Sequence, residues 1–232
     1  MEKIEDLLEM QGCRLLKRED TFNFRCTCCG ACCRNREDVI LNIHDILRIQ
    51  SYLNISFQEL IEEYGDLYIG FPSKIPIVRI KPKGKNKICP FLYKGKCKIH
   101  TIKPAVCALF PLARVTKINL KGNTAEVQYA LQKTTCGARD TINKVENWVR
   151  DYDSERNLAI ISKWNEFIAK ASQLIHSLEF QPDEIFYSYM TYILYENYPK
   201  DVDLVVEINY RMQALSSVIQ EISESDNENQ KK

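Results

Sequence analysis

The chain contains 232 residues, ten of them cysteines, and its formal net charge is +1 at pH 7. This length allows a buried core without disulfide staples, so the cysteines are not needed merely to hold a miniature fold together. Charged residues interrupt every apolar stretch before it reaches the length of a signal peptide or a membrane helix, so the sequence predicts neither, and favours a cytoplasmic location with reduced thiols.

Short helices are predicted in two parts of the first 64 residues, over 1–10 and between 42 and 64. Apolar residues at helical spacing favour a short amphipathic helix over residues 1–10. Between residues 42 and 64 the apolar positions fit two consecutive helices that are separated at Asn54. Ser56 and Glu59 have the spacing of a capping box, so we expect the second helix to begin there.

The middle of the chain predicts strands. Prolines exclude a helix from residues 67–87, whereas branched residues between 75 and 80 favour a short strand. Two segments rich in β-branched and apolar residues, 115–120 and 124–131, flank the turn residues 121–123. This pattern predicts a β-hairpin.

The C-terminal part predicts helices, because the apolar period becomes helical from Thr141 onward. Pro182 is expected to open a helix that Pro199 closes. A last amphipathic helix is predicted from Leu204 to Ile222, and the polar tail 223–232 is predicted to be disordered.

The first cysteine group has metal-ligand spacing. Cys26, Cys29 and Cys32 are each three residues apart, and Cys33 follows directly. Two thiolates at this spacing can turn toward one centre, and Gly30 suits the tight loop between them. Adjacent cysteines tend to point in different directions, so the Cys32–Cys33 pair suggests two centres or one larger cluster.

Four further cysteines lie downstream: Cys89, Cys97, Cys107 and Cys136. Together with the first group they give eight thiols, the right number for two four-ligand centres that each hold a Zn²⁺ ion or a [4Fe–4S] cluster. Cys13 and Cys28 are left over. Buried free thiols and disulfides are the alternatives, which the close spacing and the cytoplasmic location disfavour.

The charge is unevenly distributed. Residues 74–103 contain nine lysines, one arginine and no acid, whereas acidic residues outnumber basic ones in residues 178–232. The lysines could offset the negative charge of a thiolate centre, and a protein partner or substrate stays open. Without interleaved aromatic residues we do not expect a nucleic-acid partner. His100 is predicted to lie beside the centre without ligating it, and His44 and His176 to be ordinary surface or core residues.

Five blocks of sequence carry a family resemblance: Cys26-x-x-Cys29-Gly30-x-Cys32-Cys33, Leu41-x-x-x-Asp45-x-x-Arg48, Cys89-Pro90-Phe91-Leu92, Cys97-x-Ile99-His100 and Lys103-Pro104-x-x-Cys107-x-x-Phe110-Pro111. Over about residues 22–140 they resemble the YkgJ-type cysteine-cluster family, which is described as a zinc- or iron-chelating domain. Lys103 stands where the family often has Arg, and His100 where it often has Tyr.

The resemblance implies a set of metal ligands: Cys26, Cys29, Cys32, Cys33, Cys89, Cys97, Cys107 and Cys136. Cys28 is an addition to the family pattern. The family also includes flagellin lysine N-methylases, so a cluster-dependent protein lysine methylase that uses S-adenosylmethionine is one implied function. Whether this chain is an enzyme stays open, because the sequence shows no S-adenosylmethionine-binding glycine motif.

The leading hypothesis is therefore a metal-binding protein with one or two thiolate-ligated centres of the iron–sulfur type, because Cys89-Pro90 resembles ferredoxin-type sites. A zinc-bound structural or interaction module is the runner-up, since Zn²⁺ accepts the same ligands. The predicted fold is α+β, with short strands, a β-hairpin and a C-terminal group of helices. The predicted division is an N-terminal arm over 1–21, a cysteine-cluster domain over 22–140, a helical region over 141–222 and the tail over 223–232.

Overall fold

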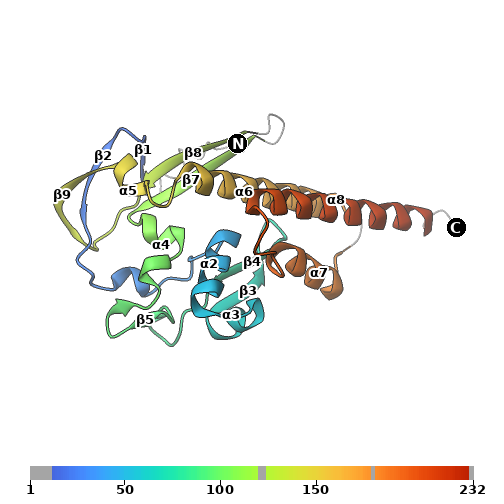
Figure 1. The fold of residues 1–232 in the computed structure, drawn as a ribbon, viewed down its shortest axis with the longest axis horizontal. Helices are drawn as coiled ribbons and strands as arrows, with labels where there is room; N and C mark the ends of the chain where they lie inside the picture. Colours follow the sequence, from blue (N-terminus) through green and yellow to red (C-terminus); the bar gives the residue numbers. More distant parts are fainter. Residues whose placement is uncertain (1–11, 120–123, 179–180, 230–232) are drawn as a thin grey trace.

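The computed structural model describes residues 12–119, 124–178 and 181–229 (Figure 1). Small antiparallel sheets form one end of the molecule and long helices the other, which confirms the predicted α+β class. The predicted helix over 1–10 and the hairpin turn 121–123 lie outside the described residues. Within the described part, no helix is both long and apolar enough to cross a membrane.

The strands pair into four small antiparallel sheets. They are β1 (Arg14–Leu16), β2 (Thr21–Arg25), β3 (Gly65–Ile69), β4 (Pro76–Ile80), β5 (Leu92–Tyr93), β6 (Lys96–Cys97), β7 (Leu112–Asn119), β8 (Thr124–Leu131) and β9 (Ala138–Lys144). The largest sheet has the order β1-β8-β7, and the others are the pairs β2-β9, β3-β4 and β5-β6. The pairing of β7 with β8 confirms the strands of the predicted hairpin, and β4 confirms the predicted short strand.

The helices follow the predicted order in the described segments. They are η1 (Ala31–Cys33), α2 (Ile43–Leu53), α3 (Phe57–Glu63), η2 (His100–Ile102), α4 (Ala105–Leu109), α5 (Val145–Val149), α6 (Glu155–His176), α7 (Glu184–Tyr195) and α8 (Leu204–Asn229). Asn54 ends α2 in the left-handed region, and Ser56 forms the predicted capping box with Glu59 at the start of α3.

Two boundaries differ from the sequence-based prediction. Residues 141–144 belong to β9 and do not begin the helical region, because they pair with β2, more than a hundred residues earlier. Helix α8 continues to Asn229, into the tail 223–232 predicted to be disordered. A helix that is already nucleated adds one hydrogen bond for each residue fixed, so a polar segment can extend it without apolar contacts.

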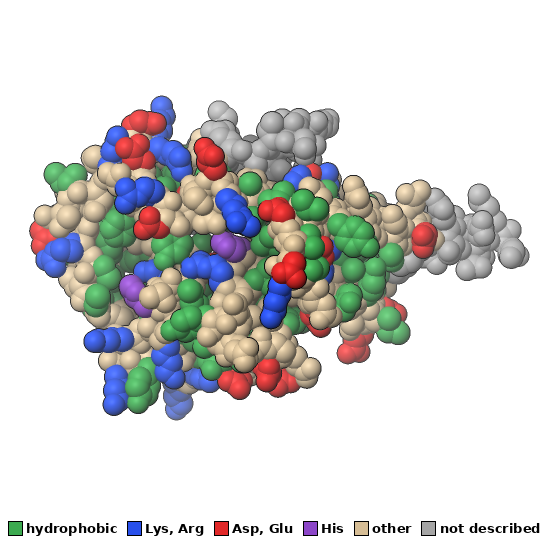
Figure 2. Space-filling model, in the orientation of Figure 1, with side chains coloured by type: hydrophobic (Ala, Val, Ile, Leu, Met, Phe, Trp, Pro, Cys, Tyr) green, Lys and Arg blue, Asp and Glu red, His purple; other side chains and the backbone are tan. Residues whose placement is uncertain are grey.

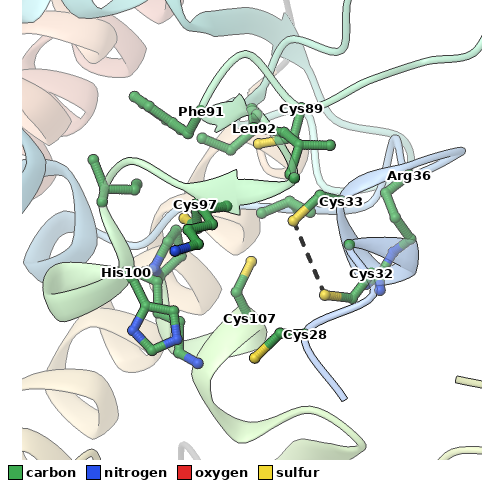
Figure 3. Close-up of a pocket in the computed structure, with 18 of the residues that line it drawn as sticks. Cys28, Cys32, Cys33, Arg36, Cys89, Phe91, Leu92, Cys97, His100 and Cys107 are labelled. Atoms are coloured by element: carbon green, nitrogen blue, oxygen red, sulfur yellow. Dashed lines mark hydrogen bonds between the residues drawn. The ribbon is translucent and has the colours of Figure 1, made fainter. Parts of the chain in front are cut away.

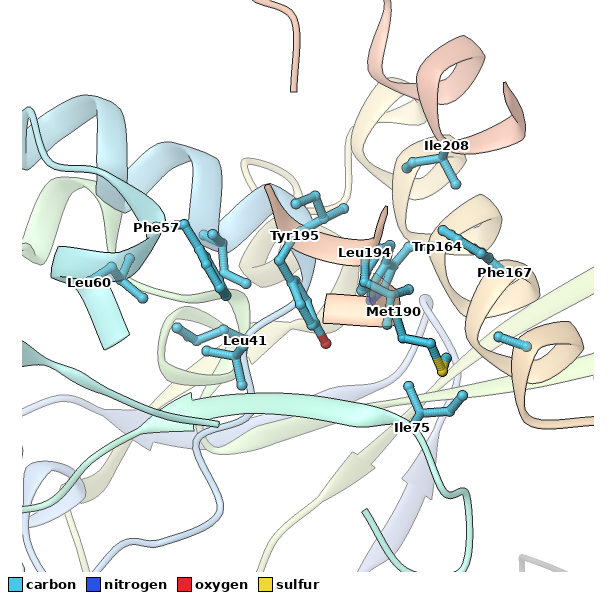
Figure 4. Packing of buried hydrophobic residues seen from close by; sticks show 14 of the residues in the cluster. Leu41, Phe57, Leu60, Ile75, Trp164, Phe167, Met190, Leu194, Tyr195 and Ile208 are labelled. Carbon is cyan, nitrogen blue, oxygen red and sulfur yellow. The ribbon is translucent and has the colours of Figure 1, made fainter. Parts of the chain in front are cut away.

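The main hydrophobic core joins the two ends of the chain (Figure 4). Side chains from α2, α3 and β4 pack with those of α6, α7 and α8 in one cluster. The Tyr195 ring stacks on Phe57 with a centroid distance of 5.6 Å, and its hydroxyl donates to the Pro76 carbonyl at 2.8 Å. Phe167 is fully buried in the same cluster. The C-terminal helices therefore complete the core of the N-terminal elements.

A smaller hydrophobic cluster lies between β2, α5 and the sheet of β7 and β8. Phe24 and Trp148 meet edge to face there, and the indole N–H of Trp148 donates to the Leu109 carbonyl at 2.9 Å. Leu109 ends helix α4, whose residue Cys107 packs against the main core. Helix α4 thus connects both clusters, and it places a cysteine between them.

Candidate metal centre

A cavity of about 310 Å³ brings the two cysteine groups together (Figure 3). Seven thiols line it: Cys26, Cys28, Cys32, Cys33, Cys89, Cys97 and Cys107. Arg36, Lys96, Lys103 and His100 complete its polar lining, and no carboxylate occurs among the described residues around it. Soft thiolate donors select zinc or iron–sulfur clusters over oxygen-preferring cations, so the donor set fits such a group.

Backbone contacts fix Cys33, Cys89 and Cys97 relative to one another. The backbone N–H of Cys89 donates to the Cys33 carbonyl at 2.9 Å, and the N–H of Leu92 donates to the Cys89 carbonyl at 3.0 Å. Leu92 begins β5 and pairs with Cys97 in β6. Gly30, at φ 71°, allows the left-handed turn that begins η1, as its place in the cysteine motif predicted.

A buried carboxylate anchors the helix that carries Cys107. Asp45 is 2% exposed on α2, and its Oδ1 accepts the backbone N–H of Ala105 at 3.0 Å. Ala105 begins α4, so this bond holds the first turn of the helix two residues before Cys107. Burial raises the pKa of Asp45 to about 6. Asp45 belongs to one of the sequence blocks that carry the family resemblance. Its role in the structure is to orient the helix that carries the cavity thiol Cys107.

Cys26 and Cys136 are held by the pairing of β2 with β9. Arg25 faces Ala138 in this ladder, which brings the chain on either side of it together. The thiols of Cys29 and Cys136 lie 3.5 Å apart, outside the residues that line the cavity. Gly137 has φ 74°, and a Cβ there would lie 2.4 Å from the Phe24 ring. Only glycine therefore permits this close approach.

Positively charged side chains that line the cavity lower the pKa values of its thiols. A hydrogen bond with Cys33 and the charge of Lys103 lower the pKa of Cys32 to about 6, while burial opposes them. Burial raises the pKa of Cys107 to about 12, and the charge of Arg36 opposes that shift. Without a bound cation the buried Cys107 thiol thus favours its neutral form, and a bound metal would stabilise its thiolate. Figure 2 shows Lys and Arg side chains gathered over the β5 region, near this cavity.

The eight predicted ligands are distributed unequally. Six line the cavity, and the other two, Cys29 and Cys136, form the neighbouring pair. Cys28 also lines the cavity, although the family pattern leaves it out. Within the described segments, no three His, Cys, Asp or Glu side chains already meet as a group that could hold one metal ion. The thiols surround a space and do not yet converge on a point.

The comparisons define the class of this cysteine-rich segment. Residues 25–137 match the model of a family described as "CxxCxxCC: Putative zinc- or iron-chelating domain". This match supports metal binding by the clustered cysteines of this segment. The match to this cysteine-rich family confirms the resemblance drawn from the sequence.

One relative and the solved structures complete the comparison. The chain is 32% identical over 90 residues to an uncharacterized protein of Methanocaldococcus jannaschii, across 38% of this chain and 44% of the relative. The match therefore spans less than half of the relative's length. No solved structure matches the chain.

Proposed function

We propose that the protein binds an iron–sulfur cluster in the cavity, with the inner thiols Cys33, Cys89, Cys97 and Cys107 as its ligands. The observation that carries this proposal is the size of the cavity. A volume of about 310 Å³ is far more than a single ion needs, which suits a cluster of several iron and sulfide atoms better than one ion.

The anchoring of the inner thiols also favours a cluster. Their chain segments are fixed by backbone hydrogen bonds, a strand pair and helix α4. A structural zinc site is closed, with four donors about 2.3 Å from the metal. Thiols held around a space of this size are better placed to bind the outer atoms of a polynuclear cluster.

The surroundings suit an anionic centre. Burial raises the pKa of Cys89, and the backbone amides of Phe91 and Leu92 oppose that rise. The positive charges of Arg36 and Lys103 line the same cavity. Such amides and charges tune the reduction potential of a cluster, which would supply one-electron chemistry when bound. A cytoplasmic location, where thiols stay reduced, fits this proposal.

Anaerobic purification tests the proposal. We expect a brown protein that contains iron and acid-labile sulfide and shows the broad visible absorption of a cluster. Cys97→Ser should remove most of this absorption, whereas Cys13→Ser should keep it, because Cys13 lies outside the cavity lining. A colourless wild-type protein that binds only zinc would favour the zinc-module alternative, since zinc accepts the same thiolates.

A further inference from the structure

A second group of charged side chains lies where α2 meets the chain that leads into α6. The Arg48 guanidinium lies over the Tyr152 ring, 5.9 Å from its centroid, and Tyr152 comes two residues before Ser154, the N-cap of α6. His44 precedes Arg48 by one helix turn, so both side chains lie on one face of α2. We call four residues from α2, β7 and α6 the basic cluster: His44, Arg48, Arg114 and Arg156. None of them lines the cysteine cavity.

The members of the basic cluster are within electrostatic reach of one another. Burial first, and then the positive charges of the three arginines, lower the pKa of His44 to about 4. Three guanidinium groups therefore lie near a neutral imidazole. Figure 2 shows a histidine and basic side chains gathered over the middle of the drawn face, where Figure 1 places α2. Positive groups this close repel one another unless anions offset them.

The two buried carboxylates of this region are already engaged. The Asp153 side chain is completely buried, and it accepts hydrogen bonds from Arg114 and from the Tyr129 hydroxyl. The Asp45 carboxylate accepts the backbone N–H of Ala105 and is 2% exposed. These acids hold the fold together, and the arginine that they satisfy directly is Arg114.

Arg48 and Arg156 keep donors for a ligand. Within the described segments Arg48 forms no ion pair, although a guanidinium carries five N–H donors. The ion pair of Arg156 with Asp203 is long, at 3.8 Å, and both side chains are more than half exposed. The N-terminus of α6, a helix of 22 residues, adds partial positive charge at the same place, which Glu155 in its first turn partly offsets.

We infer that His44, Arg48 and Arg156 form a binding site for the phosphate group of a small anionic ligand, separate from the metal centre. Guanidinium groups match the oxygens of a phosphate with paired N–H donors, and a neutral imidazole can donate one further hydrogen bond. The phosphate would join α2 to the first turn of α6 and offset the repulsion within the basic cluster. The inference does not depend on which metal the cavity holds.

Calorimetric titration of the full-length, metal-loaded protein with inorganic phosphate tests the inference. We expect saturable one-to-one binding at low salt, with a Kd of about 1 mM or below. Arg48→Gln should weaken binding about tenfold or more, the usual effect of losing a hydrogen bond to a charged group. Arg156→Gln, at an exposed position, should weaken it as well and serves if Arg48→Gln fails to fold. Arg150→Gln is the matched control, because it removes the same charge from an exposed side chain paired with Asp151, and it should bind like the wild type.

Further measurements define the ligand class and the results that would overturn the site. Acetate, with one charge and two oxygens, should bind at least about tenfold more weakly than phosphate; equal affinity would overturn the phosphate assignment. No saturable heat up to about 20 mM phosphate would overturn the site, and so would binding of a single-stranded oligonucleotide without binding of free phosphate. Equal weakening in Arg150→Gln would show a diffuse effect of surface charge and overturn it too. Metal content should be the same in all three variants, so the result is separate from that of the cavity cluster.

Discussion

The main core and the cysteine cavity are adjacent but are stabilised in different ways. The core around Phe167 is built from long helices that bury apolar side chains fully. The cavity is built from turns, two-residue strands and short helices. A strand pair this short is not stable by itself in water. The difference suggests that burial is sufficient for the helices, whereas the cysteine segments depend on a bound metal.

Metal removal should give the largest effect. Chelation under anaerobic, reducing conditions withdraws coordination free energy on the order of 10 kcal/mol for a thiolate site. We expect amide hydrogen exchange to rise sharply over residues 26–36 and 89–107, while α6 and α7 keep most of their protection. Equal loss of protection in both regions would show that the core also depends on the metal, and would break the comparison.

Phe167→Ala should damage the other side of the comparison. Phe167 is fully buried and meets Trp164 edge to face, so the variant should lose about 3–5 kcal/mol of unfolding free energy. Urea unfolding measures the loss. Because Phe167 lies outside the cavity lining, metal content per folded chain should stay at the wild-type value. Ile185→Ala, at a position 79% exposed, is the control and should change stability by less than about 0.5 kcal/mol.

Asp45→Ala should affect both regions, because Asp45 lies on α2 and holds the start of α4. The variant leaves the buried N–H of Ala105 without its acceptor, which costs about 1–3 kcal/mol. It should also weaken metal retention by loosening Cys107, measured as faster loss to a chelator. Asp45→Asn keeps an oxygen acceptor without a buried charge and should stay near the wild type in both measurements. Equal metal loss in Asp45→Asn would mean that the charge itself matters.

The sequence predicted those features that depend on local signals. The capping box of Ser56 with Glu59 and the left-handed Asn54 are encoded within a few residues, and both occur as expected. The strand β9 was missed because its partner β2 is remote in sequence. The sequence grouped the cysteines into one ligand set but could not say which thiols lie next to one another, since Cys29 lies beside Cys136 only because that ladder forms.

Cys28→Ser should have the smallest effect, and it sharpens the comparison within the cavity itself. Cys28 lines the cavity at φ 53°, a region that few residues other than glycine adopt, yet it is not one of the four proposed cluster ligands. Serine is nearly the same size, so stability should change by less than about 0.5 kcal/mol, with the iron count unchanged. Cys33→Ser is the matched comparison at an inner ligand. Loss of iron in Cys28→Ser would make Cys28 a ligand, and the inner set would then need to be redrawn around it.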